Sequence, residues 1–429
     1  MFSTIRNAFK NPELRKRLIF TIFILVVFRF GSSILVPFVN AGALKSLVGD
    51  GNNFFALLNT FSGGAFANAT IFALSIQPYI TATIIVQLLT VAIPPLERLA
   101  KEGETGRKKL NKVSRWVTLA MALVQSYAYY VLVRNQGGIE SQYLTGWAQF
   151  FTAGVIILAF TAGACAVVWL GDKITEKGIG NGVSMILFAG ILAGLPQNAQ
   201  ILIESFKQGG INYILVPFIL LVFAAMIVFI VIMTEAERRI PVQYAKRVVG
   251  RKMYGGQSSF IPIKVNMSSV MPIIFASSLL SVPGTIAAFA QPAPDSFWAG
   301  FLRVMSPQHP VYGILFAVLI IGFNYFYAAI QYNPIEIANN IKNNNGAIPG
   351  IRPGKPTSTF ISKVLSKIIF IGALFLAVIA LFPILFNSMT GIQVALGGTT
   401  IIIVVGVALE TMQQLQSQLM MRHHKGFLE

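Results

Sequence analysis

Cysteine and charged residues are scarce in this sequence. Its 429 residues include one cysteine, Cys165, and only 11% of them carry a charge. A single thiol excludes a disulfide framework within the chain and a thiolate metal cluster. The chain is 55% hydrophobic with a mean hydropathy of +0.69, which leaves too little polar surface for a soluble globular domain. The composition therefore indicates a membrane protein.

Carboxylates and histidines are nearly absent from the apolar segments. The three histidines fall in a gap or in the tail, and Glu410 lies at the end of the last apolar run. Ion-coupled carriers, metal sites and most hydrolytic sites need clusters of such groups. Glycine-rich strings at 178–182 and 103–109 lack the strand and the Lys-Ser/Thr pair of a phosphate-binding loop. We predict no catalytic site, no metal and no cofactor, so any energy comes from a partner or from the membrane potential.

Ten long apolar runs dominate what is present. Most of them approach the roughly 20 residues that a helix needs to cross the hydrocarbon core of a bilayer. Backbone amides in that core need partners within their own segment, so the runs are predicted to be helices. They span residues 18–38, 69–93, 117–133, 150–170, 183–195, 213–233, 270–290, 311–330, 368–386 and 393–409. The pattern predicts an all-α polytopic membrane protein with ten transmembrane helices.

Basic residues gather in every second gap between these runs. Of the 33 Lys and Arg residues, 28 lie in alternate gaps, four lie in the other gaps, and Arg29 lies inside the first run. Basic connections stay on the cytoplasmic side of a membrane, so both termini are predicted to be cytoplasmic. The net charge of +18 then reflects topology and contact with anionic lipid. The first run lacks a cleavage motif and is expected to be a retained anchor.

Three cytoplasmic connections, residues 94–116, 234–269 and 331–367, are longer than a carrier usually has. The second is predicted to project as an arm with Arg251 and Lys252 at its basic tip, beside glycine turn signals. The third has three prolines and two glycines within eight residues, which impose a fixed turn that presents Arg352. These charges either enforce topology alone or contact an acidic partner, and their distance from the helix ends favours contact.

The order of the runs predicts two inverted halves, residues 1–196 with five helices and residues 197–429 with five more. An odd number of spans in the first half makes the second half begin on the opposite side of the membrane. A local echo supports this, because IQPYITAT at 76–83 aligns with VMPIIFAS at 270–277. The two proline-marked helices would take equivalent places around an in-plane twofold axis, where inverted-repeat proteins build their pathway.

Two features leave alternatives open. The apolar segment at 54–66 is too short to span a bilayer, and Gly63 and Gly64 would end its helix, so it lies at the interface or folds back into a cavity. Arg29 either reaches the interface, bonds to helix-end carbonyls or lines a wet cavity. The last option permits an insertase with a groove arginine, and the second makes Arg29 a structural residue.

Ten short strings, in one order along the whole chain, resemble those of the SecY family, which forms the channel of the bacterial protein translocon. They are FSGG (61–64), PYI (78–80), KEGE (101–104), GR (106–107), WLG (169–171), IT (174–175), GIGNG (178–182), QYAK (243–246), KVN (264–266) and PGIRPG (349–354). Each string lies in the kind of segment assigned above. The resemblance implies an hourglass channel of ten helices in two inverted halves, closed by a plug.

The resemblance also implies the residues of the channel. A pore ring of apolar side chains at the waist comprises Ile76, Ile80, Leu187, Ile274 and Ile403. The plug is residues 54–67, and its named members are Phe54, Leu57, Leu58, Phe61, Gly63 and Gly64. Polar residues of a lateral gate between the second and seventh helices are Gln87, Ser277 and Ser278. The residues that this resemblance implies for partner docking are Arg251, Lys252 and Arg352.

The function implied is passive conduction of unfolded secretory preproteins across the bacterial plasma membrane, with lateral insertion of membrane proteins. By the same resemblance the expected partners are the small subunits SecE and SecG, the motor ATPase SecA, the ribosome, signal sequences and lipids. An apolar ring dewets when empty and moulds around a passing chain without binding it strongly. The alternatives are a secondary transporter of small solutes and an insertase that uses Arg29, and the absence of buried carboxylates disfavours the transporter.

Overall fold

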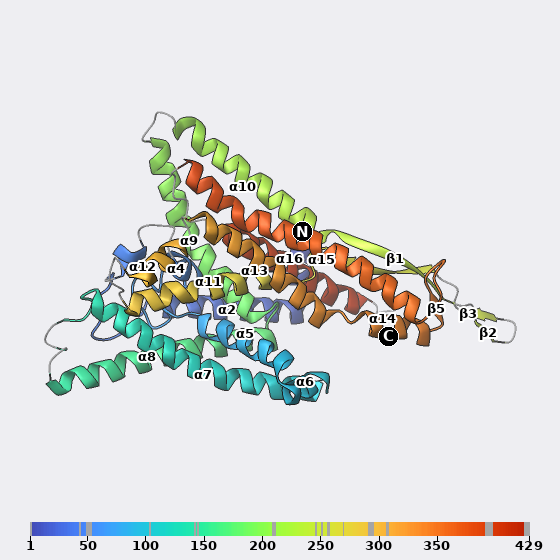
Figure 1. The fold of residues 1–429 in the computed structure, drawn as a ribbon, viewed down its shortest axis with the longest axis horizontal. Helices are drawn as coiled ribbons and strands as arrows, with labels where there is room; N and C mark the ends of the chain where they lie inside the picture. Colours follow the sequence, from blue (N-terminus) through green and yellow to red (C-terminus); the bar gives the residue numbers. More distant parts are fainter. Residues whose placement is uncertain are drawn as a thin grey trace.

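The fold is a bundle of long helices with a small β-sheet at one end (Figure 1). The computed structural model describes residues 2–42, 44–48, 54–102, 104–140, 143, 146–207, 212–244, 247–249, 252–254, 258–268, 270–290, 296–305, 309–390 and 398–423. We call the end that carries the sheet the arm side. The opposite end, which carries the short helices α4 (Phe54–Phe61) and α12 (Phe297–Val304), is the plug side.

Each of the ten predicted runs overlaps one long helix. These are α2 (Pro12–Gly31), α5 (Gln77–Ala92), α7 (Glu104–Asn135), α8 (Gly146–Lys177), α9 (Gly182–Lys207), α10 (Asn212–Glu235), α11 (Met271–Ala290), α13 (Pro310–Gln331), α15 (Lys355–Thr390) and α16 (Gly398–His423). Within the described residues, six helices are long and apolar enough to cross a membrane, and the bent pair of α5 and α6 (Pro94–Lys101) makes a seventh if it counts as one span. The helical fold class is confirmed, and the count of ten spans stays a prediction.

The second apolar run is helical over only part of its length. Residues 69–76 form buried turns, and Ala69 and Ser75 have positive φ angles of 50° and 47°. A left-handed residue cannot continue an α-helix, so α5 starts only at Gln77. The prediction of one helix from residue 69 was therefore wrong for its first eight positions, which instead link the plug to α5.

The two similar sequences at 76–83 and 270–277 each lie at the start of a helix. Pro78 is the second residue of α5 and Pro272 is the second residue of α11. Proline is tolerated there because the first turn of a helix leaves its backbone N–H groups unpaired, and proline has no N–H. Ile80 and Ile274 each follow their proline by two positions. The echo thus places two pore-ring residues at equivalent points of two helices. The predicted boundary between residues 196 and 197 falls inside α9, and the division into inverted halves remains a prediction.

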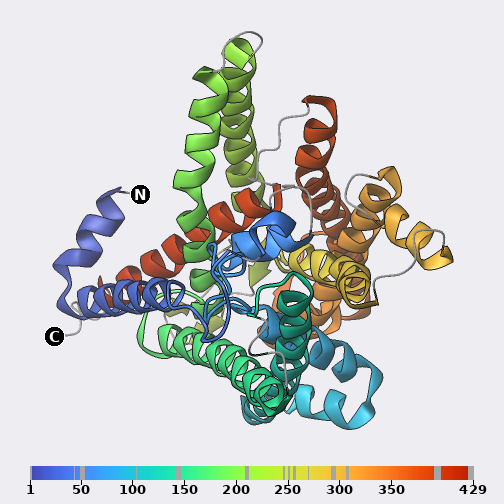
Figure 2. The ribbon, with the colours of Figure 1, turned by 90° about the vertical axis from the view of Figure 1, so that its left-hand side faces the viewer.

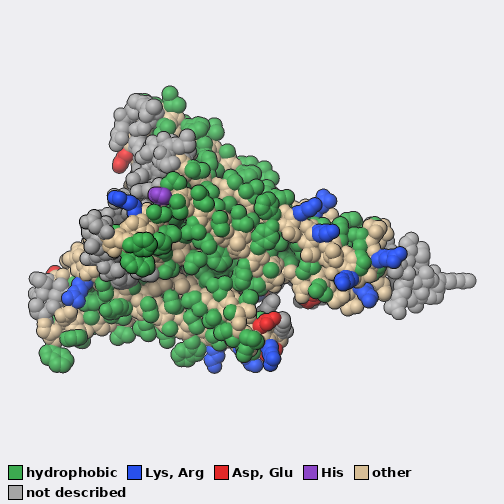
Figure 3. Space-filling view, viewed as in Figure 1, with side chains coloured by type: hydrophobic (Ala, Val, Ile, Leu, Met, Phe, Trp, Pro, Cys, Tyr) green, Lys and Arg blue, Asp and Glu red, His purple; other side chains and the backbone are tan. Residues whose placement is uncertain are grey.

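Exposed tryptophans lie near the two ends of the apolar part of α8. Trp147 near the start of α8 is 91% exposed, and Trp169 near its other end is 58% exposed. Their separation of 22 residues corresponds to about 33 Å of helix, close to the roughly 30 Å hydrocarbon core of a bilayer. Tryptophan favours the two membrane interfaces. Figure 3 shows a largely apolar surface over the middle of the molecule, with Lys and Arg side chains over the arms at the right-hand end, at the lower edge and at the left-hand end.

The two predicted arms share one β-sheet. In the first arm, β1 (Glu237–Tyr244) pairs antiparallel with β4 (Ser258–Lys264), and the short strands β2 (Arg247–Val249) and β3 (Lys252–Tyr254) pair beyond them. The second arm supplies β5 (Gly346–Ala347), which pairs with the end of β1. An all-α prediction did not include this sheet. Because β5 pairs with β1, the arms form a single unit on the arm side (Figure 1).

Short helices complete the described structure. Helix α3 (Lys45–Val48) lies on the plug side near α4, and α14 (Pro334–Asn343) packs with the arms. Helix α1 (Phe2–Lys10) packs against the start of α2 and against α16 through a small apolar cluster. That cluster contains Ala8, Leu14, Ile179 and Leu415.

Candidate functional site

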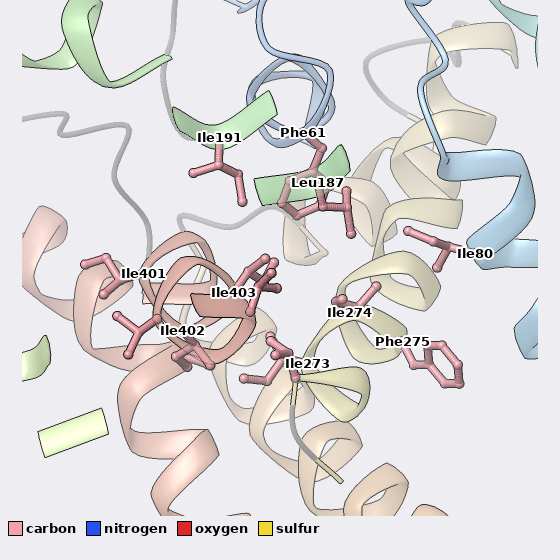
Figure 4. Close-up of a cluster of buried hydrophobic side chains, with 14 of the residues drawn as sticks. Phe61, Ile80, Leu187, Ile191, Ile273, Ile274, Phe275, Ile401, Ile402 and Ile403 are labelled. Carbon is pink, nitrogen blue, oxygen red and sulfur yellow. The ribbon is translucent and has the colours of Figure 1, made fainter. Parts of the chain in front are cut away.

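Four of the five pore-ring residues converge on one point in the centre of the bundle. Ile80 of α5, Leu187 of α9, Ile274 of α11 and Ile403 of α16 point toward one another in Figure 4. All four are buried, and so is Ile76, the residue before α5. They therefore come from helices of both predicted halves, as a constriction between two halves requires.

Two cavities lie on opposite sides of this ring. The cavity on the plug side has a volume of about 350 Å³ and includes Ile76 and Leu187 in its lining. The cavity on the arm side has a volume of about 260 Å³, and Leu187, Ile274 and Ile403 close its inner end. Leu187 lines both cavities, so a single layer of aliphatic side chains separates them there.

The walls of the two cavities differ in polarity. The plug-side cavity is lined mainly by apolar side chains and by no charged residue. The arm-side cavity is lined by Asn181, Ser184, Ser268, Gln331 and Glu410 as well as by apolar residues. A water-accessible funnel on the arm side that narrows to a dry ring is the arrangement that this lining supports.

Helix α4, which begins the predicted plug, lies near the middle of the bundle when the molecule is seen from the plug side (Figure 2). Phe61, its last residue, is buried and lies beside Leu187 of the ring (Figure 4). Gly63 and Gly64 have positive φ angles of 66° and 89°, which end the helix as the sequence predicted. Leu58 lines the plug-side cavity, whereas the side chains of Phe54 and Leu57 lie outside the described residues.

Three helices hold the plug segment by backbone contacts. Arg29 of α2 donates a hydrogen bond from Nη1 to the carbonyl oxygen of Gly63 over 2.7 Å. Tyr129 of α7 donates its hydroxyl to the carbonyl oxygen of Phe66, and the two rings meet edge to face. On α9, a Cβ atom at Gly190 would lie 2.3 Å from the carbonyl oxygen of Phe61, so only glycine lets the plug approach this closely.

The predicted gate residues differ in their contacts. Gln87 of α5 accepts a hydrogen bond at Oε1 from the hydroxyl of Tyr327 on α13. Ser277 instead donates to the carbonyl oxygen of Ile274 in its own helix over 2.9 Å, so this bond does not join two helices. Ser278 lines the plug-side cavity, which also reaches residues of α7 such as Met121 and Val124. That cavity therefore extends between α7 and α11.

The predicted docking residues lie on the arms. Arg352 is exposed in a turn that the hydroxyl of Thr357 closes by donating to the carbonyl oxygen of Arg352 over 2.8 Å. Lys252 begins the short strand β3, but its side chain lies outside the described residues, as does the whole of Arg251. The structure thus brings the ring and α4 together, while Gln87 lies seven residues beyond Ile80 on α5 and the turn with Arg352 lies between β5 and α15 on the arm side.

Sequence reasoning missed several residues of this site. Ile191 is fully buried one helical turn from Leu187 and belongs to the same central cluster. Its spacing of four residues from Leu187 repeats the spacing of Ile76 and Ile80, which was a usable signal. Tyr129 and Tyr327 had no such signal, because each contacts a partner far away in the sequence. Within the described residues, no group of three or more His, Cys, Asp or Glu side chains could hold a metal ion.

Comparisons with known proteins agree with this geometry. A family model described as SecY matches residues 70–412. The chain is similar to a protein translocase subunit SecY from Halalkalibacterium halodurans, with 43% identity over 440 residues and full coverage of both chains. It is also similar to a solved structure of a protein conducting channel, with a TM-score of 0.65, 18% identity and 96% of each chain covered. A second solved structure, reported for the plug domain of the SecY protein, gives a TM-score of 0.64 at the same identity and coverage.

Proposed function

This chain belongs to the SecY family, and on that premise we propose that it forms the pore through which unfolded secretory preproteins cross the bacterial plasma membrane. Hydrophobic segments leave the same pore sideways into the lipid. The chain is a multi-pass membrane protein and a channel subunit by its family. We further propose that it has no catalytic activity of its own and that SecA or the ribosome drives the passage.

The observation that carries this proposal is the aliphatic ring between two cavities. Ile80, Leu187, Ile274 and Ile403 meet at a level where the cavity walls on either side contain no buried ion pair or titratable cluster among the described residues. A narrow apolar constriction excludes water and ions when it is empty. Aliphatic side chains also change rotamer readily, so the ring adapts to a passing polypeptide and selects for no particular sequence.

The plug supports a closed resting state. Helix α4 covers the ring on the plug side, and Phe61 fills the space beside Leu187. Backbone contacts with α2, α7 and α9 hold it there. Passage of a preprotein therefore requires the plug to leave, which costs these contacts, and the plug returns when the chain has passed.

Lateral release is supported by the plug-side cavity. It extends from the ring to residues of α7 and α11, and its lining is almost wholly apolar. An apolar helix of a preprotein can exchange these contacts for lipid contacts at little cost. Gln87 and Tyr327 bridge α5 and α13 by a hydrogen bond, and in this proposal opening of the gate breaks it.

The arms support docking of a cytoplasmic partner. The sheet and its apolar core hold the turn that presents Arg352, while basic residues of the arms face outward (Figure 3). We propose that Arg352 contacts SecA and that Arg251 and Lys252 contact ribosomal RNA phosphates, with an affinity that falls as salt is raised. SecE and SecG complete the assembly in this proposal.

The alternative of a secondary transporter for small solutes has no support from the family to which this chain belongs. An insertase that uses Arg29 in a groove is disfavoured because the guanidinium bonds to the plug segment. Both termini are placed in the cytoplasm by the charge pattern, and this orientation remains part of the proposal.

The direct test is reconstitution of the chain with SecE, SecG and SecA in lipid vesicles. Added preprotein should become protected from external protease only when ATP is present. Vesicles with SecA but without the chain supply the background, and addition of detergent must remove the protection. If the chain is correctly inserted and protection does not depend on it, the proposed function is wrong.

A further inference from the structure

Arg29 is a charged residue in the last turn of α2, inside the first apolar run. The described residues contain no carboxylate paired with it by an ion pair. Its hydrogen bond over 2.7 Å goes to the backbone carbonyl of Gly63, which follows the plug helix. Arg29 is exposed in the isolated chain, and a guanidinium within an apolar run of a membrane helix favours a polar partner, which the carbonyl group of Gly63 supplies.

Two helix ends compensate the charge of Arg29. Helix α2 ends at Gly31, two residues after Arg29, and α4 ends at Phe61, two residues before Gly63. The C-terminal end of a helix carries unpaired carbonyl groups and a partial negative charge, which favours a cation. The guanidinium therefore lies between two negative helix ends, and one of them belongs to the movable plug.

The contact is sterically specified. Gly63 has a φ angle of 66°, a conformation that favours glycine, and its carbonyl group accepts the bond from α2. A Cβ atom at Gly63 would lie 3.2 Å from Cα of Gly190 and 3.3 Å from Nη1 of Arg29. The end of the plug thus fits between the guanidinium on one side and α9 on the other.

We propose that Arg29 is a positioning residue that keeps the plug in its closed place. Since its bond is made to the backbone, it depends on the turn at Gly63 and not on a plug side chain. When the plug leaves, α4 takes its carbonyl groups away and Arg29 keeps only its own helix end. Arg29 therefore stabilises the closed channel relative to the open one and takes no part in conduction. This inference rests on the proposed function of the chain as a plugged channel.

The test measures ion leak in the assembled complex with SecE and SecG in planar bilayers. Arg29→Gln and Arg29→Met should raise the resting conductance several-fold, and Arg29→Lys, which keeps the charge, should give an intermediate value. Arg303→Gln is the matched control, since it neutralises an exposed arginine on α12, a helix of the plug side that packs against α11. ATP-dependent protection of preprotein in vesicles should persist in all four variants.

The rate of thiol labelling in the plug gives a second readout, and it can be measured in a variant that keeps the positive charge at position 29. In a Cys165→Ser background, Leu58→Cys should react faster with a membrane-impermeant thiol reagent from the outer side when Arg29→Lys is also present. Unchanged conductance and unchanged labelling, in complexes that still translocate preprotein, would overturn the role of Arg29 alone. Failure of the parent complex to protect preprotein would overturn the proposed function instead.

Discussion

The hydroxyl of Tyr327 on α13 donates a hydrogen bond to Oε1 of Gln87 on α5, 240 residues away in the sequence. The bond joins the two predicted halves of the chain at the proposed lateral gate. Tyr327 also packs against Phe275 of α11, with ring centroids 5.0 Å apart. Tyr327 thus links α5 of the first predicted half to α11 and α13 of the second, and the proposed gate opens between these two groups of helices.

We expect Tyr327→Phe to make the gate open more readily, because it removes the hydroxyl and keeps the ring. An interhelical hydrogen bond in a membrane averages about 0.6 kcal/mol, which corresponds to a shift of about threefold in the gate equilibrium. The measurement is the fraction of marginally hydrophobic test segments that insert into the bilayer. Tyr325→Phe is the control, because the hydroxyl of Tyr325 bonds to Ser366 within the second half. Equal insertion by both variants would contradict the gate assignment.

Loss of aliphatic bulk from the ring should make the resting channel leak. Ile80→Ser and Ile274→Ser place a small polar group at the waist, which lets water and then ions enter. The readout is single-channel conductance without preprotein. Ile401→Ser is a matched control, because Ile401 is buried on α16 yet points away from the ring centre (Figure 4). Ile191→Ser should behave like Leu187→Ser if Ile191 belongs to the ring. If Ile80→Ser and Ile274→Ser leave the conductance unchanged while Ile401→Ser raises it, the assignment of the ring is wrong.

The close approach of the plug to α9 yields a prediction about one glycine. Gly190→Ala adds a Cβ atom only 2.3 Å from the carbonyl oxygen of Phe61, so the plug must shift and the closed state weakens. Gly194→Ala, one turn further on the same helix, meets nothing within 4 Å and should leave the channel closed. Resting conductance distinguishes the two, and comparable closure of both would mean that α4 does not sit against α9.

Charge reversal on the second arm should uncouple the motor from the pore. Arg352→Glu is expected to abolish SecA-driven, ATP-dependent protection of preprotein, because the exposed guanidinium lies in a turn that fixes its position. Lys355→Glu changes an exposed cation three residues away and serves as the control. Membrane insertion, checked by alkaline extraction, should be normal for both. Full activity of Arg352→Glu would remove this residue from the docking surface.

Local sequence signals predicted a large part of this structure. Runs of apolar residues located the long helices, and Gly63 and Gly64 marked the end of α4. Pro78 and Pro272 lie at two helix starts, but the prediction did not use this signal at Pro78, because the helix was expected to begin at residue 69. Each of these signals acts through the backbone of the residue itself or of its close neighbours. The buried turns at 69–76 escaped prediction because their apolar composition is the same as that of a helix in the bilayer.

Long-range contacts could not be predicted in the same way. The strands of the first arm had a usable pattern, since Ile240 and Val242 alternate with exposed residues and face the core of the arms. The partners of Arg29, Tyr129 and Tyr327 are set by packing between distant segments. For Arg29 the sequence left three possibilities, and the structure places its guanidinium on a carbonyl at a helix end.

The pairing of β5 with β1 gives the arms a mechanical property. Gln243 and Tyr244 are tied to Ala347 and Gly346 by backbone hydrogen bonds, so the two loops cannot move independently without breaking the sheet. Along the chain, β1 follows α10, β4 precedes α11, and β5 lies between α14 and α15. Lys264 also bonds to Gln413 of α16 over 2.7 Å. If a motor docks on the arms as proposed, we expect a force on either loop to reach both arms and α16 through these bonds.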